Sequence, residues 1–137
     1  MPTCATRLQS EACRFDIERR SAAALLMRIE GHDVGEFGAL PMRCLEAFMF
    51  AGQPVELFVD ARATRGASMD VSQAWADWLG RERARFAAIH MLTGSRYVQF
   101  TAEFVRRFSE LEAVMRVYRE AAEFDAALAA ASPGAPA

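Results

Sequence analysis

The sequence contains no lysine, because all 16 of its basic residues are arginine. This absence excludes a Schiff-base lysine and the phosphate-binding lysine of a P-loop. Cysteines number three, an odd count, and they include no CxxC pair. Neither a disulfide framework nor a thiolate zinc site is therefore expected, and a reduced, cytoplasmic protein is the simplest interpretation.

Long apolar runs are also missing. The longest internal segment without a charged residue is 86–95, far shorter than the ~20 residues of a membrane-spanning helix. The N-terminus has no apolar stretch of signal-peptide length. The formal net charge of −2 provides no field that would favour nucleic acid or an anionic membrane. We therefore expect no membrane span and no nucleic-acid partner.

The apolar pattern predicts an α/β fold with the element order β-β-α-β-α-β-α-β-α. Strands that alternate with helices imply a single mostly parallel sheet of four to five strands, with helices packed on it. The short turn between the first two strands makes the first an antiparallel edge strand. We expect a flexible N-terminus over 1–11, one α/β domain over 12–131 and a disordered tail over 132–137.

Periodicity places the individual elements. Alternating apolar residues predict the first two strands, and a period of 3.6 predicts the helices. Asp33 and Glu36 have the spacing of a capping box for the first helix, which ends before Gly52. The expected strands are 13–18, 25–29, 55–59, 86–92 and 114–118, and the expected helices are 37–48, 70–79, 97–111 and 121–131.

A buried strand followed by a loop and a helix organises the rest of the chain. The strand, 55–59, is apolar on both faces, which is typical of a central strand. We expect it to end at Asp60, and a loop of small residues, 62–67, to lead into a helix that begins near Ser68 or Asp70. In open α/β sheets, binding sites lie at the carboxyl ends of strands, where this loop is placed.

Five polar residues around this loop form the candidate partner-binding site. Ser68 has the position of a helix N-cap, and the helix dipole would also favour a phosphate there. Two interpretations of Ser68 are therefore open, a structural cap and a phosphorylation switch. Two arginines near the helix N-terminus, Arg62 and Arg65, match an anion or partner site, with a solvated surface loop as the alternative. Asp60 and Asp70 complete the group.

No catalytic residue and no metal site are predicted. His90 shares a face of its strand with Phe86, and we expect a buried, hydrogen-bonded core residue rather than a base. No motif of a paired nucleophile and base occurs. His32, Asp33 and Glu36 lie close in sequence, but a fourth ligand is missing and helix capping explains the two carboxylates.

Aromatic residues at helical spacing are expected mainly to fill the core. An apolar pocket between helices and sheet is the alternative. That pocket would be lined by Trp75, Trp78, Phe104 and His90. A third use is self-association into a homodimer, because Tyr97, Phe100 and Phe104 span more than half a helical turn and one of them is expected to face outward.

Four segments carry a resemblance to a known fold: LLMRIEG (25–31), VELFVDAR (55–62), RFAAIHML (85–92) and MRVYREAAEFDAAL (115–128). With the element order, they resemble the STAS fold of bacterial anti-sigma-factor antagonists. They are similar also to the STAS-like and CRAL-TRIO-like family of bacterial proteins called sporulation factor AA-like. The resemblance covers most of the chain, but its motifs are core patterns that say more about fold than about function.

The resemblance implies a non-enzymatic regulatory or scaffold module that binds a protein and needs no cofactor. In the antagonists, a kinase phosphorylates a serine at the start of the helix after the central strand, and Ser68 has that position here. The antagonists carry an Asp-Ser-Ser-Gly type of sequence, whereas residues 65–70 read RGASMD. The resemblance also suggests relatives that carry lipids. They imply a second possible function, a carrier or sensor of a small apolar ligand.

Overall fold

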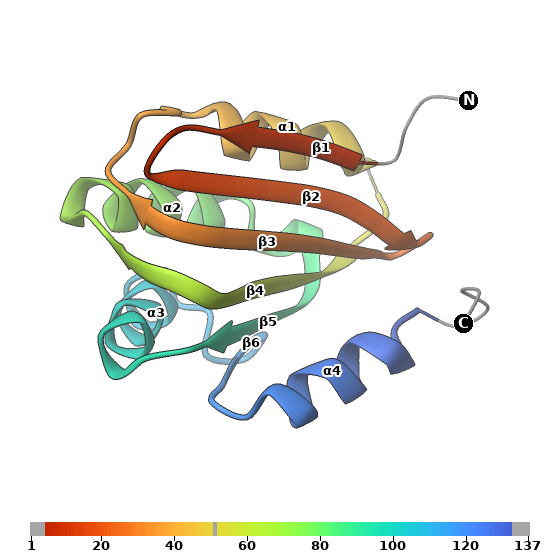
Figure 1. Ribbon diagram of the computed structural model, residues 1–137. Coiled ribbons are helices and arrows are strands. Elements are labelled where there is room, and N and C mark those ends of the chain that lie inside the picture. The colour runs from red at the N-terminus through yellow and green to blue at the C-terminus, as the bar shows by residue number, and fades with distance from the viewer. Residues whose placement is uncertain (1–4, 51, 133–137) are drawn as a thin grey trace.

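A mixed sheet of six strands forms the centre of the protein (Figure 1). The structure is a computed structural model and describes residues 5–50 and 52–132. The strands are β1 (Ala5–Gln9), β2 (Cys13–Ser21), β3 (Ala24–Asp33), β4 (Val55–Ala67), β5 (Phe86–Thr93) and β6 (Met115–Tyr118). The helices are α1 (Leu40–Phe48), α2 (Met69–Arg81), α3 (Arg96–Phe108) and α4 (Ala121–Ala130), with a short 3-10 helix, η1 (Arg83–Arg85).

The strands lie in sequence order, β1-β2-β3-β4-β5-β6. The first two pairings are antiparallel and the other three are parallel, so the predicted fold class and antiparallel edge are confirmed. The predicted number of strands was too low by at least one. The difference is β1, which pairs with β2 along residues 14–18. A five-residue strand is too short for its apolar period to stand out from the sequence.

The prediction of a flexible N-terminus over 1–11 is therefore wrong for 5–9. Leu8 packs against the main core, and Arg7 forms an ion pair with Asp16 of β2 at 2.6 Å. Residues 1–4 and 133–137 lie outside the described part of the chain, so the predicted disorder of the tail stays a prediction.

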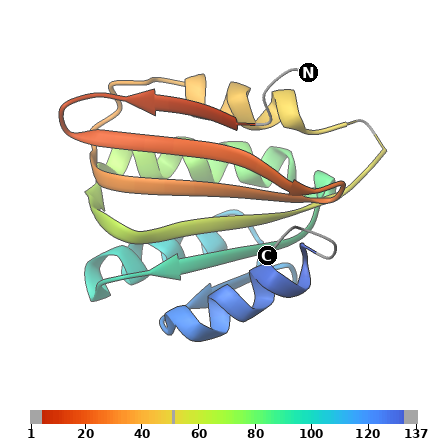
Figure 2. The same ribbon diagram turned by 45° about the vertical axis from the view of Figure 1, so that its right-hand side comes forward.

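Helices cover the two faces of the sheet unequally (Figure 2). Helices α1, α2 and α3 pack on one face and build the larger core, in which Phe15, Leu45 and Leu57 are fully or almost fully buried. Among the helices of the described residues, α4 is the one that lies on the other face, where Phe58 and Phe124 are fully buried in a smaller core. None of the helices within residues 5–50 and 52–132 is both long and apolar enough to span a bilayer.

The part of the second face that α4 leaves uncovered is charged. Arg7 and Asp16 pair across β1 and β2, and Arg14 of β2 pairs with Glu30 of β3. Glu18 of β2 lies 3.8 Å from Arg28 of β3. Cross-strand ion pairs thus replace apolar packing on this half of the sheet.

Helix α1 begins later than the sequence suggested. Its N-cap is Ala39, which makes no side-chain capping bond, and a proline stands in its first turn. The predicted capping box of Asp33 and Glu36 is wrong, because Asp33 ends β3 and its carboxylate accepts a hydrogen bond from Gly35 N at 2.9 Å. Gly35 and Gly38 have positive φ angles, which break the helical path before residue 39.

The predicted loop over 62–67 is wrong, because β4 continues to Ala67. Its distal part pairs with β3 alone and ends opposite Asp33. Two register shifts between β3 and β4 absorb the extra residues of β4. Sequence patterns did not reveal this extension because alanine and glycine are poor strand formers and the partner strand supplies the hydrogen bonds. The remaining elements agree with prediction to within a few residues.

Candidate functional site

The candidate site lies where β3 and β4 end and α2 begins. Ser68 is the N-cap of α2, and its Oγ accepts a hydrogen bond from Val71 N at 3.2 Å. Ser68 N donates to the Asp33 carbonyl at 2.9 Å, which ties the start of α2 to the end of β3. Ser72 Oγ donates to the Ser68 carbonyl at 3.1 Å. The predicted cap is therefore present, and the half-buried hydroxyl is held at the positive end of a 13-residue helix.

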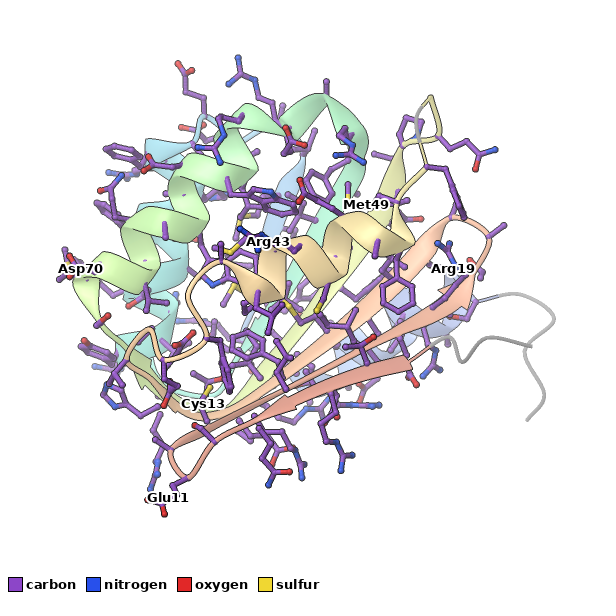
Figure 3. All side chains as sticks on the ribbon, turned by 90° about the horizontal axis from the view of Figure 1, so that it is seen from above. Glu11, Cys13, Arg19, Arg43, Met49 and Asp70 are labelled. Carbon is purple, nitrogen blue, oxygen red and sulfur yellow. The ribbon has the colours of Figure 1, made fainter. Side chains whose placement is uncertain are left out.

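The residues that follow Ser68 face solvent. Met69 is 73% exposed, and Asp70, also exposed, stands in the first turn of α2. Figure 3 shows Asp70 at the outer end of α2, with α1 running beside that helix. The Asp70 carboxylate stabilises the helix N-terminus and also makes the surface beside Ser68 negative.

A surface hollow of about 210 Å³ separates the first turns of α1 and α2. Its lining is mostly apolar, with two carboxylates at one end: Asp33, Gly35, Phe37, Gly38, Pro41, Met42, Asp70, Val71, Ala74 and Trp75. Two exposed apolar residues, Val34 (59%) and Leu40 (44%), adjoin this lining in sequence. The hollow is smaller than the ~300–1,000 Å³ of a typical small-molecule pocket, and it suits an apolar side chain of a partner protein.

Arg62 lies on the face of the sheet that α4 covers, and not beside the hollow between α1 and α2. Asp60 Oδ1 accepts hydrogen bonds from the Arg62 backbone N–H at 3.1 Å and from its Nε at 3.0 Å. Arg62 Nη2 also donates to Asp125 of α4 at 2.8 Å. These two carboxylates, Asp60 first, raise the pKa of Arg62 above its usual value. Arg62 and Asp60 therefore connect α4 to the middle of β4.

Arg65 is separated from both groups. It lines a shallow hollow at the β1–β2 turn, together with Glu11 and Glu30 among others. Within the described residues it forms no ion pair. The structure therefore divides the five predicted site residues into three places: Ser68 with Asp70, Asp60 with Arg62, and Arg65 alone.

His90 lies in the smaller core rather than in a pocket. Its ring stacks on Phe58, with centroids 4.2 Å apart and planes 3° from parallel. Nδ1 lies 2.8 Å from the Tyr118 hydroxyl and Nε2 2.9 Å from Glu56 Oε2. The half-buried ring is thus hydrogen-bonded on both sides. Glu56 and Phe58 share a face because they are two residues apart in one strand, whereas their contacts with His90 and Tyr118 depend on the order of the strands in the sheet.

The prediction that His90 and Phe86 point to the same face of β5 is wrong. Phe86 is buried in the larger core, together with Ile89, on the face opposite His90. The reason is a register shift at the start of β5, where Phe86 pairs with Val55 but Ala88 pairs with Glu56. One extra residue reverses the face to which every later side chain points.

The predicted pocket is largely wrong. A cavity of about 90 Å³ lies between α2, α3 and the sheet, and of the four predicted residues only Trp75 lines it. Trp78 and Phe104 pack elsewhere against the same core, and His90 lies across the sheet. A cavity of 150 Å³ accepts benzene. At about 90 Å³, this cavity therefore has no room for a fatty acid or an isoprenoid.

A further polar group brings Cys13 of β2 next to Asp33 and Glu36, which are close in sequence. Cys13 Sγ and carboxylate oxygens of Asp33 and Glu36 all lie within 4.8 Å of one another, and these are the donors that residues 5–50 and 52–132 could offer a metal ion. Burial, with the two carboxylates, raises the pKa of the Cys13 thiol to about 12. Burial also raises the pKa of Asp33. His32 lies outside this group.

No family model and no curated protein matches the sequence. Several chains of solved structures have a similar fold, among them the following two. An uncharacterised DUF3478-family protein with a SpoIIAA-like fold from Shewanella loihica PV-4 matches at a TM-score of 0.63 and 12% identity, over 88% of this chain and 98% of its own. The anti-sigma factor antagonist SpoIIAA, in its unphosphorylated form, matches at 0.55 and 20% identity, over 82% of this chain and 95% of its own.

The chain therefore has a SpoIIAA-like, or STAS-like, fold, and the predicted resemblance is confirmed at that level. Neither structure is described as a CRAL-TRIO protein, so that part of the resemblance has no support. At these identities the likeness concerns the fold alone.

Proposed function

We propose that this chain is a non-enzymatic regulatory module that binds a protein partner through the segment 60–75, with the first turn of α2 at its centre. The observation that carries the proposal is the surface around Ser68. A capped serine, an exposed Met69 and an acidic Asp70 adjoin a mostly apolar hollow at the carboxyl ends of β3 and β4. The similar fold of a protein described as an anti-sigma factor antagonist supports a regulatory role.

In this proposal, Ser68 is the switch. A phosphoryl group on Oγ would add a charge of about −1.5 to −2 beside Asp70 and above the buried Asp33. The helix dipole would favour that charge, so the helix would persist while the surface became strongly negative. A partner that inserts an apolar side chain into the hollow would then be released. Asp60 and Arg62 connect the middle of β4 to α4, and Arg65, which lies apart from the hollow, offers the partner a separate positive charge.

The test uses three baits in lysate of the source organism: wild type, Ser68→Asp and Ser95→Asp. Ser95 is the matched control, because it caps α3 through a 3.2 Å bond from Val98 N, as Ser68 caps α2. We expect one protein to be retained by wild type and Ser95→Asp and lost by Ser68→Asp. The purified pair, followed by calorimetry, should then show at least a tenfold weaker affinity for Ser68→Asp. Equal retention by all three baits would remove the switch, and no retained protein would count against the binding function.

A carrier of a small apolar ligand is the alternative function, and the cavity beside Trp75 is the place for it. Its small volume favours the binding function instead. Native mass spectrometry distinguishes the two, because a carrier purified from its host should keep an additional mass, whereas the proposed regulator should show the mass of the chain alone.

A further inference from the structure

Helix α3 exposes a stripe of aromatic side chains. The stripe consists of Tyr97, Phe100, Phe104 and Phe108, of which Tyr97 is 59%, Phe100 76% and Phe108 54% exposed. Phe104 and Phe108 stack with ring centroids 5.5 Å apart. The opposite side of the helix buries Val98, Ala102 and Val105, so the fold itself makes little use of the stripe.

The stripe is large for the free surface of a monomer. Tyr97, Phe100 and Phe108 together expose roughly 400 Å², since each aromatic side chain offers about 150–250 Å². Exposed apolar patches of this size usually mark a site of interaction. A groove of about 550 Å³ follows the stripe and is lined by Phe100, Glu103, Phe104, Arg107 and Phe108.

Opposite charges lie along one flank of the stripe. Glu103 and Arg107 are one helical turn apart and both line the groove. An α-helix turns by about 100° per residue, so Glu103 and Arg107 lie on the same side of Phe104 around the helix. The buried face of α3 begins on the other side of Phe104. Glu103 contacts Arg106 at 3.1 Å, whereas Arg107 is exposed and forms no ion pair within the described residues.

We propose that two copies of this chain associate through the α3 stripe, with the helices antiparallel about a two-fold axis. Such an axis places the same flank of both helices on the same side of the interface. With Phe104 at the two-fold axis, Phe100 faces Phe108 of the second copy. Along the direction of the helices, Glu103 is then offset by about 3 Å from Arg107 of the second copy. Two long side chains can bridge that offset, and the symmetry makes a second such pair.

Charge complementarity is the reason for choosing a second copy as the occupant. In the antiparallel pair, Glu103 of each copy lies next to Arg107 of the other copy. In a parallel pair, the two charged flanks would lie on opposite sides of the interface and could not meet. Mutual burial of the stripes, with their flanks, would cover about 1,000 Å² in total, the lower limit for a specific interface. We therefore expect a reversible dimer with a dissociation constant on the order of micromolar.

Sedimentation velocity over protein concentrations of about 1–500 µM tests the proposal. Wild type should shift from monomer to dimer across this range, and Phe100→Ser should stay monomeric. Met69→Ser is the matched control, because Met69 is as exposed as Phe100 but lies on α2, and it should dimerise like wild type. A wild type that stays monomeric at 500 µM would overturn the proposal, as would a Phe100→Ser variant that dimerises equally well.

A charge exchange tests the antiparallel geometry separately. Glu103→Arg should weaken the dimer at least tenfold, because two arginines of each copy would then face two of the other. Adding Arg107→Glu exchanges the charges and should restore most of the affinity. If the double variant dimerises more weakly than Glu103→Arg alone, the proposed pairing is wrong. Circular dichroism of each variant establishes that α3 remains folded.

Discussion

Truncation of Phe124 to alanine should destabilise the protein strongly, because this residue anchors α4 on the second face of the sheet. Phe124 is fully buried and packs edge-to-face against Phe58 at 5.8 Å and Tyr118 at 5.7 Å. A buried phenylalanine truncated to alanine costs about 3–5 kcal/mol. A domain of this size has a total stability of about 5–15 kcal/mol, so the loss is a large share of it.

Urea unfolding measures this loss. With a slope of about 2 kcal/mol per molar urea, a loss of 4 kcal/mol lowers the midpoint by about 2 M. Phe100→Ala is the control, because that side chain is 76% exposed, and at micromolar or lower concentration its midpoint should stay close to that of wild type.

Two probes distinguish undocking of α4 from global unfolding. Trp75 and Trp78 lie in the other core, so their fluorescence reports on α1, α2 and α3, whereas far-ultraviolet circular dichroism reports on all helices. Coincident curves mean that the two cores unfold together. A midpoint change below about 0.5 M, by both probes, would refute the assignment of Phe124 as the anchor of α4.

Three further predictions concern single residues. Ser68→Ala should lose about 1 kcal/mol of unfolding free energy, because the cap of α2 is removed. Ser68→Asp should stay within a few tenths of a kcal/mol of wild type, because aspartate also caps helices. Urea unfolding measures both variants, and a large loss in Ser68→Asp would contradict the capping geometry. Burial raises the pKa of Asp33, so the folded state should lose stability as pH rises through that pKa. Asp33→Asn should therefore be more stable than wild type at pH 7, with a difference that disappears below the ordinary aspartate pKa of about 3.9; a constant difference in urea midpoint across pH would contradict this. The Cys13 thiol, 3% exposed with a pKa raised to about 12, should resist iodoacetamide at pH 8 in the folded protein and react in urea; peptide mapping would reveal early labelling if the prediction is wrong.

Periodicity predicted those elements that have a strong local pattern. Helix α2, its cap at Ser68 and the buried strand β5 all follow from residues close together in sequence. Strand β1 and the distal half of β4 did not, because both depend on hydrogen bonds to a neighbouring strand rather than on their own side chains.

The candidate site was predicted only where its geometry is local. Ser68 and Asp70 share one helical turn, so their proximity follows from the sequence. Arg62 binds Asp125, which is 63 residues away and becomes a neighbour only because α4 packs over the middle of β4. Cys13 reaches Asp33 through the β2–β3 register, in which Cys13 pairs with Gly31. Single-sequence patterns contain no signal for such long-range contacts.

The ion pairs on the uncovered half of the sheet also limit what can attach there. Arg7, Arg14 and Arg28 each face a carboxylate on a neighbouring strand. A second sheet that stacked on this face would have to remove the water around every one of these pairs, and that desolvation is unfavourable. The outermost strand, β1, is only five residues long and offers few backbone groups for another chain to extend. Further growth of the sheet into a fibre is therefore opposed both across its open face and along its edge.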